Sequence, residues 1–372
     1  MRIFYFAPID WDFIRQRPQH LAQRLSTAHD FFYIQPIGVR DLKFSDLSRA
    51  VRRLSSLGLE LLQRKGAGSR LRIKNLFFFP LQHDLFRTVN VFLLRRQLRG
   101  LVCPGDAIWV TSPSPLLPGI LRDLPRKALI YELMDDYPKI HASKEASVRK
   151  TEAWLIEHAH LVITTSDALS QKVRAQHPGK KILQVSNGVD YAFFNREIPA
   201  AKPDEFTGMD KIAGYIGTLD TWLDFETIYY AAEKRRDIHF VFIGPSKISP
   251  FPGKPNIHFL GTRDYEQIPW YCSFFDTCLI PFHPGEFADS VNPVKLFEYF
   301  SLGKPVVSCA MKELLPYRDL LYTARDREDF LLKLEASLQE TDKGLCERRK
   351  KVAGSNDWNE KAREINAALA EL

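Results

Sequence analysis

The sequence predicts an α/β protein with two domains, each built on a doubly wound parallel sheet. Three observations lead to this prediction. Short apolar runs typical of buried strands alternate with helical stretches, the alternation stops at a polar segment that contains prolines, and it then starts again. The 372 residues are sufficient for two domains with full cores. We expect the carboxyl edges of the two sheets to face each other across a cleft.

The first half alternates strands with helices from its first residues. Apolar runs predict strands at 2–7, 31–34, 107–111, 128–131, 161–165 and 182–185. Helical spacing predicts helices at 19–25, 42–63, 85–98 and 147–158, and from residue 167 onwards. Because a helix returns the chain to the start of the next strand, these strands are expected to be parallel.

The alternation is interrupted at 197–210, where Pro199, Pro203 and Gly208 lie among small and charged residues. We interpret this segment as an interdomain linker, between a first domain at 1–198 and a second at 199–345. Strands are then expected at 211–216, 239–243, 257–260, 277–281 and 306–309. The second half therefore predicts a second Rossmann-like domain.

One helix of the second half has signals for both of its ends. Asn292 is expected to cap its free N–H groups, and Pro293 suits the first helical position. Gly303 supplies a left-handed stop, and Pro305 prevents the helix from continuing.

The first turn of this helix carries Lys295, where the helix dipole is already positive, so the position favours a bound anion. Glu298 lies three residues on, on the same face of the helix. A cation at a helix start beside an acceptor carboxylate suits a nucleotide, with phosphate on the lysine and ribose hydroxyls on the glutamate. The alternative is an exposed ion pair between the two side chains.

Two adjacent carboxylates, Asp135 and Asp136, follow the strand at 128–131, at the edge of the sheet where ligands bind. One can raise the pKa of the other towards that of a useful base. The alternative is a helix cap with a solvated neighbour.

The loop after the first strand has no GxGxxG sequence and carries Arg15 and Arg17, which favours an anionic or polar ligand other than a dinucleotide. A solvated loop remains the alternative there.

Positive charge is concentrated between residues 41 and 99, which contain thirteen lysines and arginines against four acidic residues. The helices expected at 42–63 and 85–98 are basic and amphipathic, and Phe86 and Phe92 lie on the second. Such helices suit the surface of an anionic membrane. The alternative is that both helices pack on the sheet with solvated arginines. No nucleic-acid-binding module accompanies the charge, so we expect no nucleic acid partner.

The five cysteines are scattered, with spacings that match neither a zinc site nor a redox pair. The sequence shows no run of about 18 uncharged apolar residues and no signal-peptide pattern. We therefore expect a cytoplasmic protein that is peripheral on the inner face of the membrane, with no metal and no cofactor.

Several motifs occur in the order and spacing of a known family. They are Ser186-Asn-Gly-Val-Asp190, Gly214-Tyr-Ile-Gly-Thr-Leu219, Asn256-Ile-His-Phe-Leu-Gly261, Pro293-Val-Lys-Leu-Phe-Glu-Tyr-Phe-Ser-Leu-Gly-Lys-Pro-Val-Val307 and Asp357-Trp358. Together they resemble the GT-B glycosyltransferases, specifically the group 1 (family 4-like) branch, over nearly the whole chain. Trp11 and Arg17-Pro-Gln-His-Leu21 resemble a subgroup of teichuronic-acid and capsule type, and the arrangement is similar to the glucuronosyltransferase of xanthan assembly.

The resemblance implies transfer of a sugar from a nucleotide diphosphate sugar, with UDP the expected nucleotide, to a lipid-linked or oligosaccharide acceptor. It places a catalytic base on Asp135, beside Asp136, and a phosphate-binding lysine on Lys295. The helix at 346–372 would cross back to the first domain. The other donor-binding candidates are Gly217, Thr218, Gly244, Gly261, Asn292 and Glu298. The acceptor-binding candidates are Asp12, Arg15, Arg17 and Gln19.

Two departures from the family pattern leave the stereochemical outcome open. Ser290 stands where a second glutamate is usual, and Asp220 and Asp224 follow Gly217 where a basic pair normally holds the donor diphosphate. Two alternatives also stay open, namely a nucleotide-sugar 2-epimerase of the same fold and a non-catalytic protein that binds nucleotides or saccharides.

Overall fold

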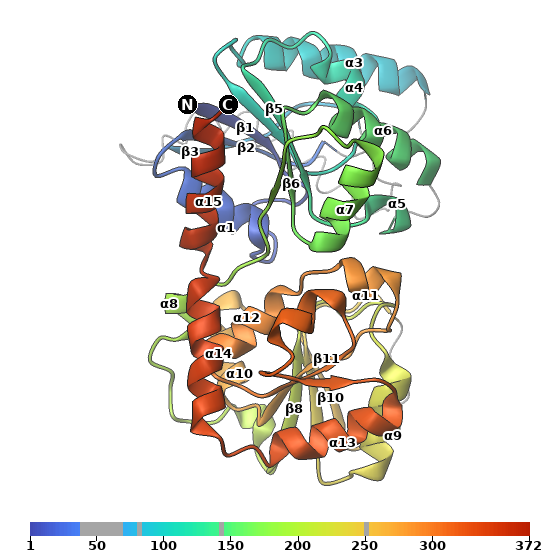
Figure 1. Ribbon diagram of the computed structural model, residues 1–372, viewed down its shortest axis with the longest axis vertical. Helices are drawn as coiled ribbons and strands as arrows, with labels where there is room; N and C mark the ends of the chain where they lie inside the picture. Colours follow the sequence, from blue (N-terminus) through green and yellow to red (C-terminus); the bar gives the residue numbers. More distant parts are fainter. Residues whose placement is uncertain (38–69, 80–83, 141–144, 249–252) are drawn as a thin grey trace. The chain divides into compact units, whose positions relative to one another are not determined.

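The computed structural model describes the chain except for residues 38–69, 80–83, 141–144 and 249–252 (Figure 1). The described residues form two compact units. The first unit comprises Met1–Val185 together with Ala362–Leu372, and the second comprises Ser186–Lys361. The basic helix expected at 42–63 lies entirely within 38–69 and therefore outside the described residues.

The sheet of the first unit is parallel throughout, with the strand order β3-β2-β1-β4-β5-β6-β7. Its central strands are buried along their whole length because both faces of the sheet are covered, as is usual for parallel sheets. The strands are β1 (Arg2–Phe6), β2 (Asp30–Ile34), β3 (Leu71–Lys74), β4 (Ala107–Val110), β5 (Ala128–Leu133), β6 (Leu161–Thr164) and β7 (Ile182–Gln184).

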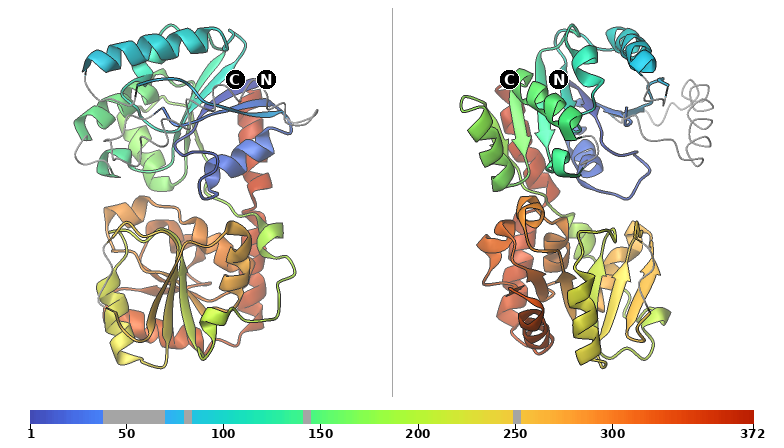
Figure 2. Two further views of the ribbon diagram at one scale, coloured as in Figure 1. Left: turned by 180° about the vertical axis from the view of Figure 1, so that it is seen from behind. Right: turned by 90° about the vertical axis from the view of Figure 1, so that its right-hand side faces the viewer.

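Helices cover both faces of this sheet (Figures 1 and 2). Helix α3 contributes Leu94 and Leu98 to one apolar cluster with Phe4 and Phe32 of the sheet, whereas α1 packs on the opposite face. The helices of the unit are α1 (Arg17–Leu25), α3 (Asp84–Arg99), α4 (Leu117–Leu121), α5 (Tyr137–Ile140), α6 (Glu145–His158) and α7 (Asp167–Gln176). The last residues of α15 (Trp358–Ala370) also belong to this unit.

The second unit repeats the design with a parallel sheet in the order β10-β9-β8-β11-β12-β13. The strand order reverses between β8 and β11, so right-handed crossovers place the helices after these two strands on opposite faces. The strands are β8 (Ile212–Ile216), β9 (His239–Ile243), β10 (Ile257–Gly261), β11 (Thr277–Ile280), β12 (Val306–Cys309) and β13 (Tyr322–Ala324).

The α-helices of the second unit include α12, which follows β11 and packs closely on α14. They are α8 (Tyr191–Phe194), α9 (Phe225–Lys234), α10 (Ile268–Ser273), α11 (Glu286–Ser290), α12 (Val294–Ser301), α13 (Arg327–Leu338) and α14 (Lys343–Ser355). The prediction of two doubly wound parallel α/β sheets is thus confirmed.

The structure divides the chain at 185/186 and 361/362, not at the predicted 198/199 and 345/346. The segment 197–210 is folded into the second unit, where Phe206 is fully buried in the core. Val189 pairs with Asp357, which ties the beginning of the second unit to its end. Helix α14 belongs entirely to the second unit. The boundary at 361/362 falls within α15, whose first residues belong to the second unit and whose last residues belong to the first.

The predicted start of the 292–303 helix is wrong by one residue. Pro293 itself is the cap residue of α12, with extended backbone, and the helix begins at Val294. Asn292 makes no capping hydrogen bond, because its side chain is used elsewhere. The predicted stop is confirmed: Gly303 has φ 70°, in the left-handed region that favours glycine.

Candidate active site

The carboxyl edge of the second sheet brings Gly217, Gly244 and Lys295 into direct contact. Gly217 follows β8 with φ 150°, and Gly244 follows β9 with φ 148°. A Cβ on Gly217 would lie 2.1 Å from Cε of Lys295, and a Cβ on Gly244 would lie 2.0 Å from the carbonyl oxygen of Gly217. Both positions therefore require glycine, because the lysine stem and the two loops leave no room for a side chain.

Lys295 is half-buried in the first turn of α12 and has no counter-ion among the residues that the structure describes. Its Nζ lies 5.8 Å from the centroid of the Tyr215 ring. Burial lowers the pKa of Lys295, and the nearby Glu298 carboxylate partly opposes this shift. Burial likewise raises the pKa of Glu298. The alternative of an ion pair between Lys295 and Glu298 is not formed in the structure.

The other predicted donor residues of this edge lie around the same glycines. The N–H of Gly244 donates to the carbonyl of Gly261 at 2.9 Å, so the ends of β9 and β10 are held together. The carbonyl of Thr218 accepts from the hydroxyl of Tyr215 at 3.2 Å. The hydroxyl of Tyr299 on α12 accepts from the N–H of Ile216 at 3.0 Å, and this bond anchors the helix to β8.

Neither tyrosine was identified from the sequence. Tyr215 is part of an apolar strand, and its hydroxyl gives no sequence signal that separates it from other buried tyrosines. The four-residue spacing from Lys295 to Tyr299 could have shown that both lie on neighbouring turns of one helix.

Asn292 joins α12 to the Asn-Gly-Val-Asp motif within the second unit. Its Oδ1 accepts from the N–H of Asn187 at 3.0 Å, and its Nδ2 donates to Glu313 at 3.1 Å. Its carbonyl accepts from Nδ2 of Asn187 at 2.7 Å. The motif then continues into the pairing of Val189 with Asp357. Asn292 thus holds the loop that positions Lys295, and its predicted contact with the donor stays a prediction.

We expect Asn292→Ala to lower the free energy of unfolding by roughly 1–3 kcal/mol, because it leaves buried polar groups without partners. Chemical denaturation measures this loss. Asn359→Ala is the control, since Asn359 is an exposed asparagine of α15. An equal effect of both substitutions would contradict the structural role of Asn292.

The two acidic residues that replace the usual basic pair have structural partners. Asp224 caps α9 by accepting from the N–H of Thr227 at 3.0 Å. Asp220 forms an ion pair with Lys247 at 3.0 Å. Lys247 follows β9 and was not among the predicted site residues, although a lysine just beyond a parallel strand is a recognisable signal. A cation is therefore present at this edge, but it is Lys247 from the loop after β9, held by Asp220 of the loop after β8.

In the first unit, Asp135 lies just beyond the carboxyl end of β5 and is half-buried. Its carboxylate forms no hydrogen bond or ion pair with any residue in the described part of the chain. Burial, and secondly the charge of Asp136, raise the pKa of Asp135 to about 6. A carboxylate with such a pKa and free oxygens has the properties of a general base near neutral pH.

Asp136 differs from its neighbour because it is held by lysines. Nζ of Lys172 lies 2.9 Å from Asp136 and 2.7 Å from Glu152, and Lys139 lies 3.5 Å from Asp136. Burial raises the pKa of Glu152, which is nearly inaccessible to solvent. Lys172 and Glu152 were not predicted, because both belong to helices distant in sequence from Asp136. The two adjacent aspartates therefore have different environments, with Asp135 free and Asp136 fixed.

We expect Lys172→Met to raise the pKa of Asp135 further, because it removes a positive charge from beside Asp136. The acidic limb of the pH–activity profile should then move to higher pH by up to about one unit. Lys139→Met is the matched control and should move the limb less, since Lys139 is more distant and more exposed. A shift to lower pH in a folded Lys172→Met variant would exclude this arrangement.

Arg17 occupies the interior of the first unit. Its Nε donates to the fully buried Glu132 at 2.6 Å, and Glu132 also accepts from Trp109 at 3.0 Å and Tyr5 at 3.3 Å. Strand β5 extends to Leu133, two residues beyond its predicted end, which places Glu132 inside the sheet. The solvated-loop alternative is thus wrong for Arg17, and its contact with an acceptor stays untested.

The remaining predicted acceptor residues lie in or beside the loop after β1. Gln19 is buried, accepts from the N–H of Gln16 at 3.1 Å and donates to the carbonyl of Asp10 at 3.3 Å, so it fixes the loop. Arg15 is half-buried and hydrogen-bonds Gln23. Asp12 is exposed. Their contacts with an acceptor stay predictions.

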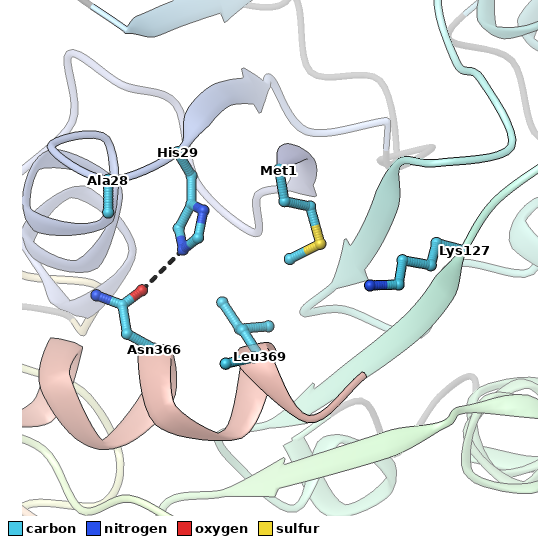
Figure 3. Close-up of a pocket in the computed structure, with 7 residues that line it drawn as sticks. Met1, Ala28, His29, Lys127, Asn366 and Leu369 are labelled. Carbon is cyan, nitrogen blue, oxygen red and sulfur yellow. Dashed lines mark hydrogen bonds between the residues drawn. The ribbon is translucent and has the colours of Figure 1, made fainter.

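A pocket of about 340 Å³ in the first unit lies at the opposite edge of the sheet (Figure 3). His29 and Asn366 meet there through a 2.9 Å hydrogen bond that fastens α15 to the first unit. The pocket is lined by Met1, Ala28, His29, Lys127, Asn366, Leu369 and Ala370. Because it adjoins the amino ends of β1, β2 and β5, it is separate from Asp135.

The described residues contain no group of three or more His, Cys, Asp or Glu side chains arranged to hold a metal ion. The expected metal independence stays a prediction. Within the same residues, no helix has the length and apolar character needed to cross a membrane.

No protein-family model matches the chain. The chain is similar to TuaH of Bacillus subtilis (strain 168), a glycosyltransferase provisionally assigned to teichuronic acid biosynthesis. The two sequences are 26% identical over 327 residues, which cover 81% of this chain and 82% of the relative.

Solved structures show the same two-domain fold. Sucrose-phosphate synthase from Thermosynechococcus elongatus has a TM-score of 0.74 at 13% identity, covering 100% of this chain and 99% of its own. HepE from Anabaena in complex with UDP-glucose has a TM-score of 0.68 at 15% identity, covering all of both chains. WaaG, of lipopolysaccharide biosynthesis, has a TM-score of 0.64 at 12% identity, covering 98% of each. The predicted GT-B fold is thereby confirmed.

Proposed function

We propose that this chain, a glycosyltransferase of the GT-B fold, moves a sugar from a UDP-sugar to a lipid-linked or oligosaccharide acceptor at the cytoplasmic face of a membrane. The donor would occupy the second unit and the acceptor the first. UDP is proposed as the nucleotide because HepE, a structure of the same fold, binds UDP-glucose.

The observation that carries the proposal is Lys295 at the start of α12, which has no counter-ion in the described part of the chain. Lys295 lies against Gly217, at the carboxyl edge of the second sheet, where ligands of open α/β sheets bind. A desolvated ammonium group beside a helix N-terminus favours the charge of a diphosphate. As the bond to the sugar breaks, negative charge develops on the leaving UDP, and Lys295 would stabilise it.

Groups near Lys295 would contact the other parts of the nucleotide. The N–H of Thr218 would add a donor to the diphosphate, and Glu298 would accept from the ribose hydroxyls. The predicted phosphate contact of the Gly217 N–H is wrong, because this group donates to the carbonyl of Ile243 at 2.8 Å. The backbone near Gly244 and Gly261 would contact the base, since the structure holds these two loops together.

In the first unit, Asp135 would take the proton of the attacking acceptor hydroxyl. No described residue binds its carboxylate oxygens, and a pKa of about 6 keeps it ionised at neutral pH. Asp136 and Lys172 would keep a fixed charge beside it. A general base of this kind corresponds to direct displacement with inversion at the sugar, as we propose here.

Contact with a membrane is supported by the outer face of α3. Phe92 is 62% exposed and Val89 is 36% exposed, although Leu94 and Leu98 of the same helix are buried. Exposed arginines at positions 87, 96 and 99 flank these apolar side chains. An apolar ridge bordered by cations suits the headgroup region of an anionic bilayer.

A thermal-shift comparison of UDP-, GDP- and dTDP-sugars tests the donor, because a ligand that binds only the folded state raises its stability. We expect UDP-sugars to give the largest shift. Incubation with the selected donor and lipid-linked acceptors, followed by mass spectrometry, tests transfer. Conversion of the donor sugar without any acceptor would favour an epimerase, and binding without transfer or conversion would exclude both enzymes.

A further inference from the structure

A basic groove crosses the edge of the first sheet, on the face that α3 covers. It has a volume of about 490 Å³ and collects side chains from β1, β2, β3 and the turn after α3. The residues that line it are Arg2, Asp30, Phe32, Arg72, Lys74, Gly100, Leu101 and Cys103. A volume of this order is typical of sites for small ligands.

The floor of the basic groove is aromatic, and its walls carry the cations Arg2, Arg72 and Lys74 against one carboxylate, Asp30. The Phe32 ring stacks on Phe4 with centroids 4.6 Å apart. The guanidinium groups of Arg2 and Arg72 lie 5.4 Å and 5.2 Å from the centroid of Phe32. Such cation–π contacts orient a guanidinium group while they leave its N–H edge available to an anion.

Among the described residues, two of the three cations have no polar partner. Arg2 donates to the carbonyl of Leu101 and forms an ion pair with Asp106 at 3.6 Å. By contrast, the side chains of Arg72 and Lys74 form neither a hydrogen bond nor an ion pair with any residue outside the gaps of the structure. The groove therefore concentrates positive charge with donors that are free to bind.

We propose that the basic groove binds the phosphate of an anionic lipid headgroup. This proposal rests on the membrane-face action proposed above and identifies which residues contact the lipid. Arg72 and Lys74 would donate to the phosphate oxygens, and Arg2 would add charge from the side. The groove is separate from the candidate active site, because its strands β3, β2 and β1 lie at one edge of the sheet, whereas Asp135 follows β5, which lies beyond β4.

The neighbouring helix favours a lipid over a soluble phosphate compound. Gly100 lines the groove and directly follows Arg99, the last residue of α3. The exposed Phe92 on that helix gives an apolar side chain that can enter the bilayer while the groove holds a phosphate at its surface. A soluble ligand would gain nothing from an exposed aromatic residue of this kind.

Vesicle sedimentation of the full chain tests the proposal. The wild-type chain should bind vesicles of phosphatidylcholine with phosphatidylglycerol, should bind pure phosphatidylcholine weakly, and should lose affinity with added salt. The double variant Arg72→Glu, Lys74→Glu should bind the anionic vesicles at least roughly tenfold more weakly. The matched control is Arg348→Glu, Lys351→Glu, which makes the same charge change at exposed positions of α14.

Equal losses in the two double variants, or full binding by the groove variant, would overturn the proposal. Binding of glycerol 3-phosphate as tight as binding of vesicles would show a soluble ligand instead and would also overturn it. If the glutamate variant fails to fold, Arg72→Gln with Lys74→Gln supplies the same comparison. Transfer to a water-soluble acceptor reports on the proposed function separately, because the groove variant should retain it.

Discussion

Replacement of Asp135 by asparagine should lower kcat by roughly 10²–10⁴, the usual contribution of a general base. The substitution keeps the size of the side chain but removes its ability to accept a proton. Affinity for UDP should stay unchanged, because every proposed nucleotide contact lies in the second unit. Steady-state kinetics with the selected donor, and calorimetry with UDP, measure the two quantities.

The pH dependence provides an independent check on Asp135. Its pKa of about 6 means that the wild-type rate should rise with pH through about 6 and then level off, as the base loses its proton. The asparagine variant should lack this limb. Asp123→Asn is the control, since Asp123 is an exposed aspartate that pairs with Arg95. Full activity in Asp135→Asn would remove Asp135 from the mechanism.

The same substitution should leave the chain at least as stable. Folding raises the pKa of the Asp135 carboxyl from 3.8 to about 6, so the free energy of unfolding of the wild-type protein falls as pH rises between these values. The asparagine variant has no such loss. Its advantage in thermal stability should therefore be absent below about pH 4 and complete above about pH 6. A base that is kept at a cost in stability is expected of an active site.

The fold was predictable from the sequence because strand runs and helix periodicity were clear along most of the chain. The exact domain boundary was not, because composition marks flexible linkers and the segment 197–210 only looks like one. Phe206 in that segment is a single buried aromatic residue, and no periodic pattern surrounds it. The pairing of Val189 with Asp357 joins residues that are far apart in sequence, which local patterns do not report.

The candidate site shows the same division between local and distant information. Gly217, Lys295 and Glu298 could be selected because a strand end and a helix start carry recognisable local signals. The burial of Arg17 could not be foreseen, since its partner Glu132 lies on a strand more than a hundred residues away. Lys172 was missed for the same reason. Polar groups that stabilise a site from behind therefore need the tertiary structure to be found.

Replacement of Lys295 by alanine should lower kcat/KM by roughly 10²–10³, the cost of losing one charged donor to a developing anion. UDP affinity should fall by roughly 10- to 100-fold, because hydrogen bonds to charged groups contribute about 1.5–3 kcal/mol. Stability should change little, since the ammonium group is desolvated and has no counter-ion in the part of the chain that is described. Lys312→Ala, at an exposed lysine of the same unit, is the control.

Comparison of UDP with uridine separates the phosphate contact from a general effect on the site. If Lys295 binds the diphosphate, the alanine variant should lose affinity for UDP and keep its affinity for uridine. Lys295→Arg should not restore UDP binding, because Cε of Lys295 lies only 2.1 Å from where a Cβ on Gly217 would be, and a larger guanidinium group would crowd this loop. Equal losses for UDP and uridine would mean that Lys295 supports the shape of the site, and unchanged UDP affinity would exclude it from the nucleotide site altogether.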